Sequence, residues 1–156
     1  MKKFVLYIFL FQLLGNIRAQ NGTVAAAHPI AVDVVEKVFG EGGNAYDAAV
    51  AAHFALSVVL PRAGNIGGGG FAVIHTSKGE AATLDFREIA PLFATKDMFI
   101  KNNDDQSVSS LTSKSASGVP GSVKGMWNLY LKYGSRKVSW SDLLTPAILL
   151  ADTGFL

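Results

Sequence analysis

The chain of 156 residues contains no cysteine and carries a formal net charge of only +2. Without cysteine it cannot form a disulfide, a thiolate zinc site or a cysteine nucleophile. The excess of positive residues is small and scattered, so the sequence gives no indication of a nucleic-acid partner. The histidines His28, His53 and His75 share no metal-ligand spacing, and the G-x-S-x-G sequence of a serine hydrolase is missing. We expect no metal site, and we expect His53 to be a hydrogen-bonded residue of the core or its rim.

The first twenty residues have the organisation of a secretory signal peptide. A positive start at Lys2-Lys3 precedes an apolar run over 4–14, and small residues lead to Ala19. This run is too short to cross a bilayer, which takes roughly 20 residues. We therefore expect residues 1–20 to be removed and residues 21–156 to be periplasmic or extracellular, with no membrane span after cleavage. An uncleaved membrane anchor is the alternative.

The remaining residues are enough for about one domain of mixed helices and strands. A helix apolar on nearly every side is predicted to be buried, with Asn44 as its N-cap and Asp47 in its first turn. Lys78-Gly79 between two apolar runs predicts a hairpin. Together with the apolar spacing, these signals predict a strand over 24–28, helices over 30–39, 45–59 and 122–133, strands over 71–76 and 81–86, a helical turn over 140–144, and a last helix to Asp152 behind a Thr145-Pro146 start.

A glycine-rich loop over 64–70 is the strongest local signal in the chain. It fits the loose G-x-G-x-x-[GA] pattern, but a dinucleotide site needs a strand before the glycines and a helix after them. Here the predicted order is reversed, and no P-loop lysine follows, so nucleotide binding is disfavoured. Two interpretations remain: the bare backbone amides approach a ligand, or the loop is tight for packing alone.

The segment from Leu84 to Glu88 places three charged residues at the end of an apolar strand. An arginine at this position can present its planar fork of donors to a carboxylate. Alternatively, Arg87 pairs with Asp85 or Glu88 and has only a structural role. Residue types alone leave both interpretations open.

Eight short segments are distributed over nearly the whole chain after the leader. They are VAAAHP at 24–29, GGNAYDAAVA at 42–51, NIGGGGF at 65–71, LDFRE at 84–88, GVPGSV at 118–123, YG at 133–134, PAI at 146–148 and GF at 154–155. Each segment is weak alone, but in this order and at this spacing they resemble the gamma-glutamyltranspeptidase family.

The resemblance implies an N-terminal nucleophile hydrolase, an α/β fold with two sheets between helical layers (an αββα sandwich) that is only partly present in this chain. The family's precursor cuts itself into a large and a small subunit. The new N-terminal threonine of the small subunit then attacks gamma-glutamyl amides of glutathione-like substrates, without a metal or an organic cofactor. The family's D-F-R-E arginine binds the alpha-carboxylate of the glutamyl group, which makes Arg87 the expected substrate-binding residue.

The chain departs from the family's pattern in one large respect. It ends at Leu156, within what resembles the large subunit, so we expect no catalytic residue in it. It is expected to be an N-terminal fragment, 21–156 after the leader, of a secreted gamma-glutamyltransferase or glutathione hydrolase, inactive alone. Its expected partners are gamma-glutamyl compounds such as glutathione, the remainder of the large subunit and the small subunit. A non-catalytic short paralogue that acts as a binding or interaction protein is the alternative.

Overall fold

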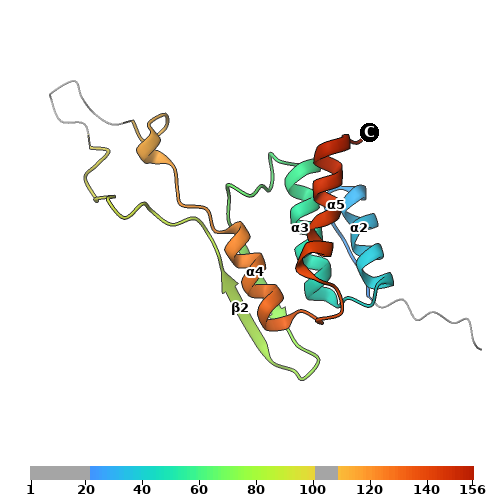
Figure 1. The fold of residues 1–156 in the computed structure, drawn as a ribbon. Helices are drawn as coiled ribbons and strands as arrows, with labels where there is room; N and C mark the ends of the chain where they lie inside the picture. The colour runs from blue at the N-terminus through green and yellow to red at the C-terminus, as the bar shows by residue number, and fades with distance from the viewer. Residues whose placement is uncertain (1–21, 101–108) are drawn as a thin grey trace, which may run out of the picture.

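The computed structural model describes residues 22–100 and 109–156, so the predicted signal peptide lies outside the described residues. Helix α3 packs against both α2 and α5, and α4 lies beside a two-stranded hairpin (Figure 1). No helix in the described ranges has the length and apolar character needed to cross a bilayer. The elements in chain order are α2 (Pro29–Gly40), α3 (Ala45–Val59), β1 (Phe71–His75), β2 (Ala81–Asp85), the short 3-10 helix η1 (Lys114–Ala116), α4 (Ser122–Tyr133) and α5 (Trp140–Thr153).

Helix α3 is the centre of the hydrophobic core, as its all-round apolar sequence predicted. Its alanines keep the helix surface small, so the neighbouring helices approach closely and their larger side chains fill the space between them. The buried cluster joins five α3 side chains to residues of α2, α4, α5 and the hairpin: Ala48, Val50, Ala51, Phe54 and Ala55 from α3, with Val34, Val35, Val38, Ile74, Met126, Leu129 and Leu143 from the other elements.

The start of α3 is closed by the predicted N-cap. The Asn44 Oδ1 accepts hydrogen bonds from the backbone N–H groups of Tyr46 (2.9 Å) and Asp47 (3.0 Å). The Asp47 carboxylate in turn accepts the Asn44 N–H at 2.9 Å, which completes a capping box. Asp47 is fully buried and also accepts the N–H of Ser135 at 3.0 Å, so the same carboxylate fastens α3 to the residues that follow α4.

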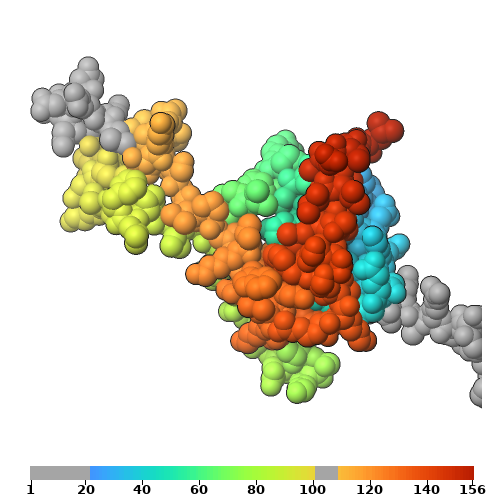
Figure 2. Space-filling view, viewed as in Figure 1, coloured from blue at the N-terminus to red at the C-terminus, as the bar shows by residue number. Residues whose placement is uncertain are grey.

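The predicted hairpin is confirmed. Strands β1 and β2 pair antiparallel, with Phe71 opposite Asp85, and Gly79 has the positive φ that the connecting turn requires. Because side chains alternate along a strand, Ile74 is buried against the helices while Phe71 and Val73 are 65% and 86% exposed. One face of the hairpin therefore packs and the other is open. Beyond β2, the segments 91–100 and 109–117 project from the helical body (Figure 2).

One prediction near the N-terminus is wrong. The segment 24–28 is irregular, with a bend at 27–28, and it is not a β-strand, although Val24 and Ala26 pack against the core. A strand requires a hydrogen-bonded neighbour, and none of the described strands pairs with this segment. The predicted helix over 30–39 is α2, which extends one residue further at each end, and the first glycine with a positive φ after it is Gly42.

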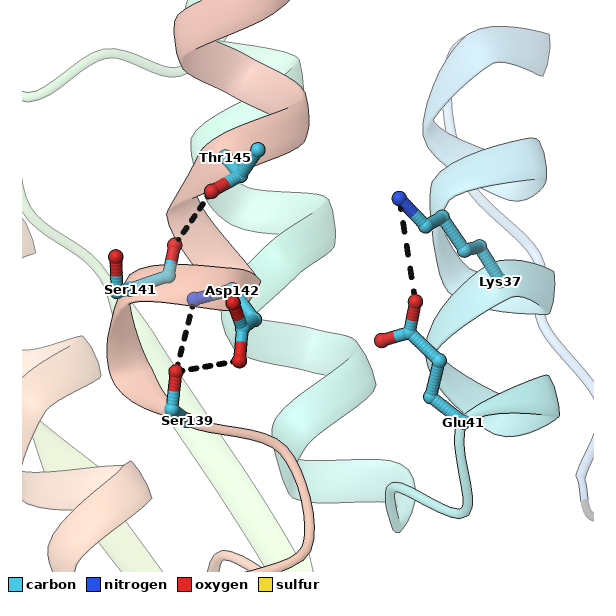
Figure 3. A network of polar contacts seen from close by, with 6 residues as sticks. All are labelled: Lys37, Glu41, Ser139, Ser141, Asp142 and Thr145. Atoms are coloured by element: carbon cyan, nitrogen blue, oxygen red, sulfur yellow. Dashed lines mark hydrogen bonds and ion pairs between the residues drawn. The ribbon is translucent and has the colours of Figure 1, made fainter.

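The C-terminal helix is also longer than predicted, because α5 runs unbroken through Pro146. Its N-cap is Ser139, whose Oγ accepts the Asp142 N–H at 3.1 Å and donates to the Asp142 carboxylate at 2.6 Å (Figure 3). Proline removes one helical N–H donor, but Leu143 and Ala147, on either side of it, are buried and hold both halves of the helix in the core. Burial therefore outweighs the local signal to start a new helix at Thr145.

Candidate functional site

Three segments far apart in the sequence meet where β2 ends: the glycine loop 64–70, the segment 85–89, and the turn 118–122. Figure 1 shows the tip of β2 beside the first turn of α4. The Phe86 N–H donates to the Gly70 carbonyl at 2.9 Å, and Ile89 and Val119 exchange backbone hydrogen bonds of 2.8 and 3.2 Å. The segment that carries Arg87 is thus bound to the glycine loop on one side and to the turn before α4 on the other.

Two glycines lie directly against the peptide between Phe86 and Arg87. A Cβ atom at Gly69 would lie 2.5 Å from the Phe86 carbonyl oxygen and 2.8 Å from the Arg87 Cα. A Cβ atom at Gly121 would lie 1.8 Å from the same carbonyl oxygen. Neither position has room for a larger residue without moving the backbone. The geometry therefore supports packing as the role of the glycine loop.

Phe86 anchors this segment in the core. Its side chain is 9% exposed, and a Cβ atom at Gly125 in α4 would lie 2.3 Å from its ring. The ring also meets that of His53 edge to face, with the ring centres 6.2 Å apart. Because the side chain and the backbone of Phe86 are both held, the next residue leaves the core at a fixed point.

That next residue, Arg87, is exposed and forms no ion pair with any described residue. Among the described residues, the ion pair present joins Lys37 of α2 to Glu41, the C-cap of that helix, at 3.9 Å (Figure 3). Asp85 contacts Arg87 through the backbone instead, since its Oδ1 accepts the Arg87 N–H at 3.0 Å. The structural pairing of Arg87 with Asp85 or Glu88, which the sequence left open, is therefore absent among the described residues, and the guanidinium forms no hydrogen bond with any of them.

A pocket of about 500 Å³ lies between residues 23–27 and the helices α2 and α3. Its lining is mostly alanine and valine, and His53 is one of the residues that line it. Burial lowers the pKa of His53, and its Nε2 is buried with no hydrogen-bond partner among the described residues. The expectation of a hydrogen-bonded His53 is therefore wrong. No group of His, Asp and Glu in the described residues could hold a metal ion.

Similarity to known proteins identifies the family of this chain. The sequence model described as gamma-glutamyltranspeptidase matches residues 31–156. The chain belongs to the gamma-glutamyltranspeptidase family. It is 46% identical, over 144 residues and 90% of its length, to the glutathione hydrolase proenzyme of Escherichia coli strain K12. It is 48% identical, over 141 residues, to the corresponding proenzyme of Pseudomonas sp. strain A14.

Solved structures of this family have the same fold. The gamma-glutamyltranspeptidase of Helicobacter pylori superposes on 88% of the chain with a TM-score of 0.78 and 51% identity. The predicted fold class, a partial α/β sandwich of the N-terminal nucleophile hydrolases, is therefore confirmed. The chain spans 24% of the length of those two proenzymes and 39% of the solved Helicobacter chain.

The sequence pointed to Arg87 but missed the residues that hold it. Gly121 and Ser122 appeared in the sequence only as part of the GVPGSV segment and at the start of the predicted helix over 122–133, with no sign of their contacts. Their contacts with the glycine loop join positions more than fifty residues apart, and periodicity and turn signals within a short window carry no information on such contacts.

Proposed function

We propose that residues 21–156 form the N-terminal part of an exported enzyme that hydrolyses gamma-glutamyl amides or transfers their gamma-glutamyl group, with residues 1–20 as its signal peptide. Family membership and the names of the relatives, glutathione hydrolase proenzymes, support this function. The substrates are glutathione or other gamma-glutamyl compounds. The threonine nucleophile belongs to a part of the enzyme beyond these residues, together with the rest of the large subunit and the small subunit.

Within this enzyme Arg87 binds the alpha-carboxylate of the gamma-glutamyl group. The observation that carries this proposal is an exposed guanidinium, unpaired by any described residue, on a backbone held between the glycine loop and α4. A gamma-glutamyl group differs from an ordinary peptide by its free alpha-carboxylate and alpha-amine. A planar guanidinium recognises the carboxylate by geometry as well as by charge.

The test is a double cycle in a full-length protein that contains this segment. The Arg87→Ala variant is compared with wild type on a chromogenic gamma-glutamyl anilide and on the 4-aminobutyryl anilide, which lacks the alpha-carboxylate. Loss of the guanidinium is expected to cost about 2–5 kcal/mol of recognition, seen mainly in kcat/KM for the gamma-glutamyl substrate. The 4-aminobutyryl substrate is expected to be poor for wild type and little affected by the variant.

Two further variants sharpen this cycle. Arg87→Lys keeps the charge but loses the fork, so it is expected to recover little of the lost kcat/KM. Arg62→Ala removes another exposed arginine outside the site and serves as the matched control. If Arg87→Ala lowers the activity on both substrates by the same factor, Arg87 does not contact the carboxylate and this role is wrong.

Export is proposed from the leader sequence. N-terminal sequencing of secreted protein is expected to begin near Gln20 or Asn21. Protein that begins at Met1 and stays in the membrane would support the uncleaved anchor instead.

A further inference from the structure

We propose that Ser122 is a positioning residue. Its buried hydroxyl binds the glycine loop to α4 and thereby holds the Arg87 guanidinium where it binds the alpha-carboxylate. This inference rests on the substrate-binding role proposed for Arg87. It assigns a function to a side chain that does not itself reach the ligand.

The Ser122 side chain joins two segments that the sequence separates widely. Ser122 is 0% exposed, and its Oγ donates to the Asn65 carbonyl at 3.0 Å. Its backbone N–H and that of Gly121 donate to the Gly68 carbonyl at 3.0 and 2.9 Å. Three hydrogen bonds therefore hold the first residues of α4 against the glycine loop, and one of them depends on the serine hydroxyl.

The hydroxyl is not used to cap its own helix. Gly121 is the N-cap of α4 and has no side chain, so no side-chain oxygen satisfies the first N–H groups of this helix. A serine at the N-cap accepts such an N–H, whereas Ser122 lies one residue further on, at the first position of α4. Here Ser122 donates across the structure to the glycine loop instead, which indicates a tertiary role.

The two segments that Ser122 joins are the same two that contact the Arg87 backbone. Gly69 belongs to the glycine loop and Gly121 directly precedes Ser122, and a Cβ atom on either glycine would overlap the Phe86 carbonyl. A close contact fixes a neighbour only if both sides of the contact stay in place. Releasing the loop from α4 therefore frees the Phe86–Arg87 peptide to shift, and a shift of this peptide moves the guanidinium away from its ligand.

The experiment uses Ser122→Ala in a full-length protein that contains this segment. The measured quantities are the competitive inhibition constants of L-glutamate and of 4-aminobutyrate, which lacks the alpha-carboxylate. Loss of one hydrogen bond is expected to raise the inhibition constant of L-glutamate by about three- to tenfold. The inhibition constant of 4-aminobutyrate is expected to stay unchanged. In the Arg87→Ala background, Ser122→Ala is expected to have no further effect on L-glutamate, since the group that it positions is already gone.

Two variants separate positioning from a general loss of structure. Ser122→Thr keeps the hydroxyl and is expected to restore most of the L-glutamate affinity. Ser57→Ala is the matched control, because it also deletes a hydroxyl that donates to a backbone carbonyl, that of His53 at 2.9 Å, but within α3 and away from the site. It is expected to leave both inhibition constants unchanged.

The outcomes distinguish the positioning role of Ser122 from the substrate-binding role of Arg87 on which it rests. If Arg87→Ala weakens the binding of L-glutamate and of 4-aminobutyrate equally, the role proposed for Arg87 is wrong, and so is the role proposed for Ser122. Suppose instead that Arg87→Ala weakens the binding of L-glutamate alone. If Ser122→Ala then weakens the binding of both inhibitors equally, or adds its full effect to that of Arg87→Ala, Ser122 is only structural. In that case Arg87 keeps its role and the positioning role of Ser122 is overturned.

Discussion

The buried carboxylate of Asp47 is expected to be the most sensitive single point of the helical layer. It is fully buried, and it accepts the N–H groups of Asn44 at 2.9 Å and Ser135 at 3.0 Å. Asn44 reinforces the same junction by donating from Nδ2 to the Tyr133 carbonyl at 2.8 Å. The Asp47→Ala substitution removes the acceptor of both N–H groups and leaves a space where the carboxylate was.

The magnitude follows from the two N–H groups that lose their acceptor. A buried N–H without a partner costs about 1–3 kcal/mol, and a helix cap contributes about 1 kcal/mol. Because the two effects share one group, we expect about 3 kcal/mol of local destabilisation rather than their full sum. Since 1.4 kcal/mol is a factor of ten, this corresponds to amide exchange on the order of a hundredfold faster at the junction.

The assay is hydrogen–deuterium exchange by mass spectrometry on a full-length protein that contains this segment. The informative peptides cover 45–56 and 128–134. Within them the amides of Ala48 and Gly134 donate to the carbonyls of Asn44 and Tyr130, so their exchange reports opening of the junction rather than direct loss of the carboxylate. Asp47→Asn keeps one oxygen acceptor and is expected to give an intermediate acceleration.

Asp142→Ala is the matched control, because Asp142 occupies the same position near the start of α5 and binds Ser139, but it is exposed. An exposed acidic residue at a helix start contributes only about 0.3–1 kcal/mol. Its removal is therefore expected to accelerate exchange in α5 by less than about tenfold. If the two substitutions accelerate exchange equally in their own helices, burial of the Asp47 carboxylate does not determine its contribution, and the reasoning above is refuted.

Three further outcomes are expected. Burial lowers the pKa of His53 below its ordinary value of 6.5, so the unfolded state binds more protons than the folded state as the pH falls below that value. The melting temperature should therefore fall as the pH drops below about 6.5, and it should fall less in His53→Leu. Equal slopes of melting temperature against pH in wild type and His53→Leu would contradict this. The 156-residue chain alone should give no turnover of a gamma-glutamyl anilide above background, because it spans about a quarter of the curated relatives; activity that follows the purified chain would disprove this. The open hairpin face, with Phe71 and Val73 exposed, should make the isolated chain self-associate in light scattering, and Val73→Thr should reduce this association unless another surface drives it.

The sequence by itself determined the elements whose ends have their own local chemistry. Helix α3 begins and ends where it was predicted, because Asn44 and Asp47 close its first turn and Pro61 follows its last. The hairpin was predictable for the same reason, since Gly79 supplies the positive φ of its turn. The motif that contains Arg87 was also visible, because charged residues at the end of an apolar strand stand out without any knowledge of the fold.

Tertiary structure decided the features that depend on distant partners. Residues 24–28 have the composition of a strand but lack a strand partner among the described residues, and hydrogen bonding to a neighbour is what makes an extended segment a strand. Helix α5 passes through Pro146 because Leu143 and Ala147 are buried on both sides of it. The glycine loop shows its role only beside Phe86 and Ser122, because a glycine needed for close packing is identified by the atoms that approach it, and those atoms come from other parts of the chain.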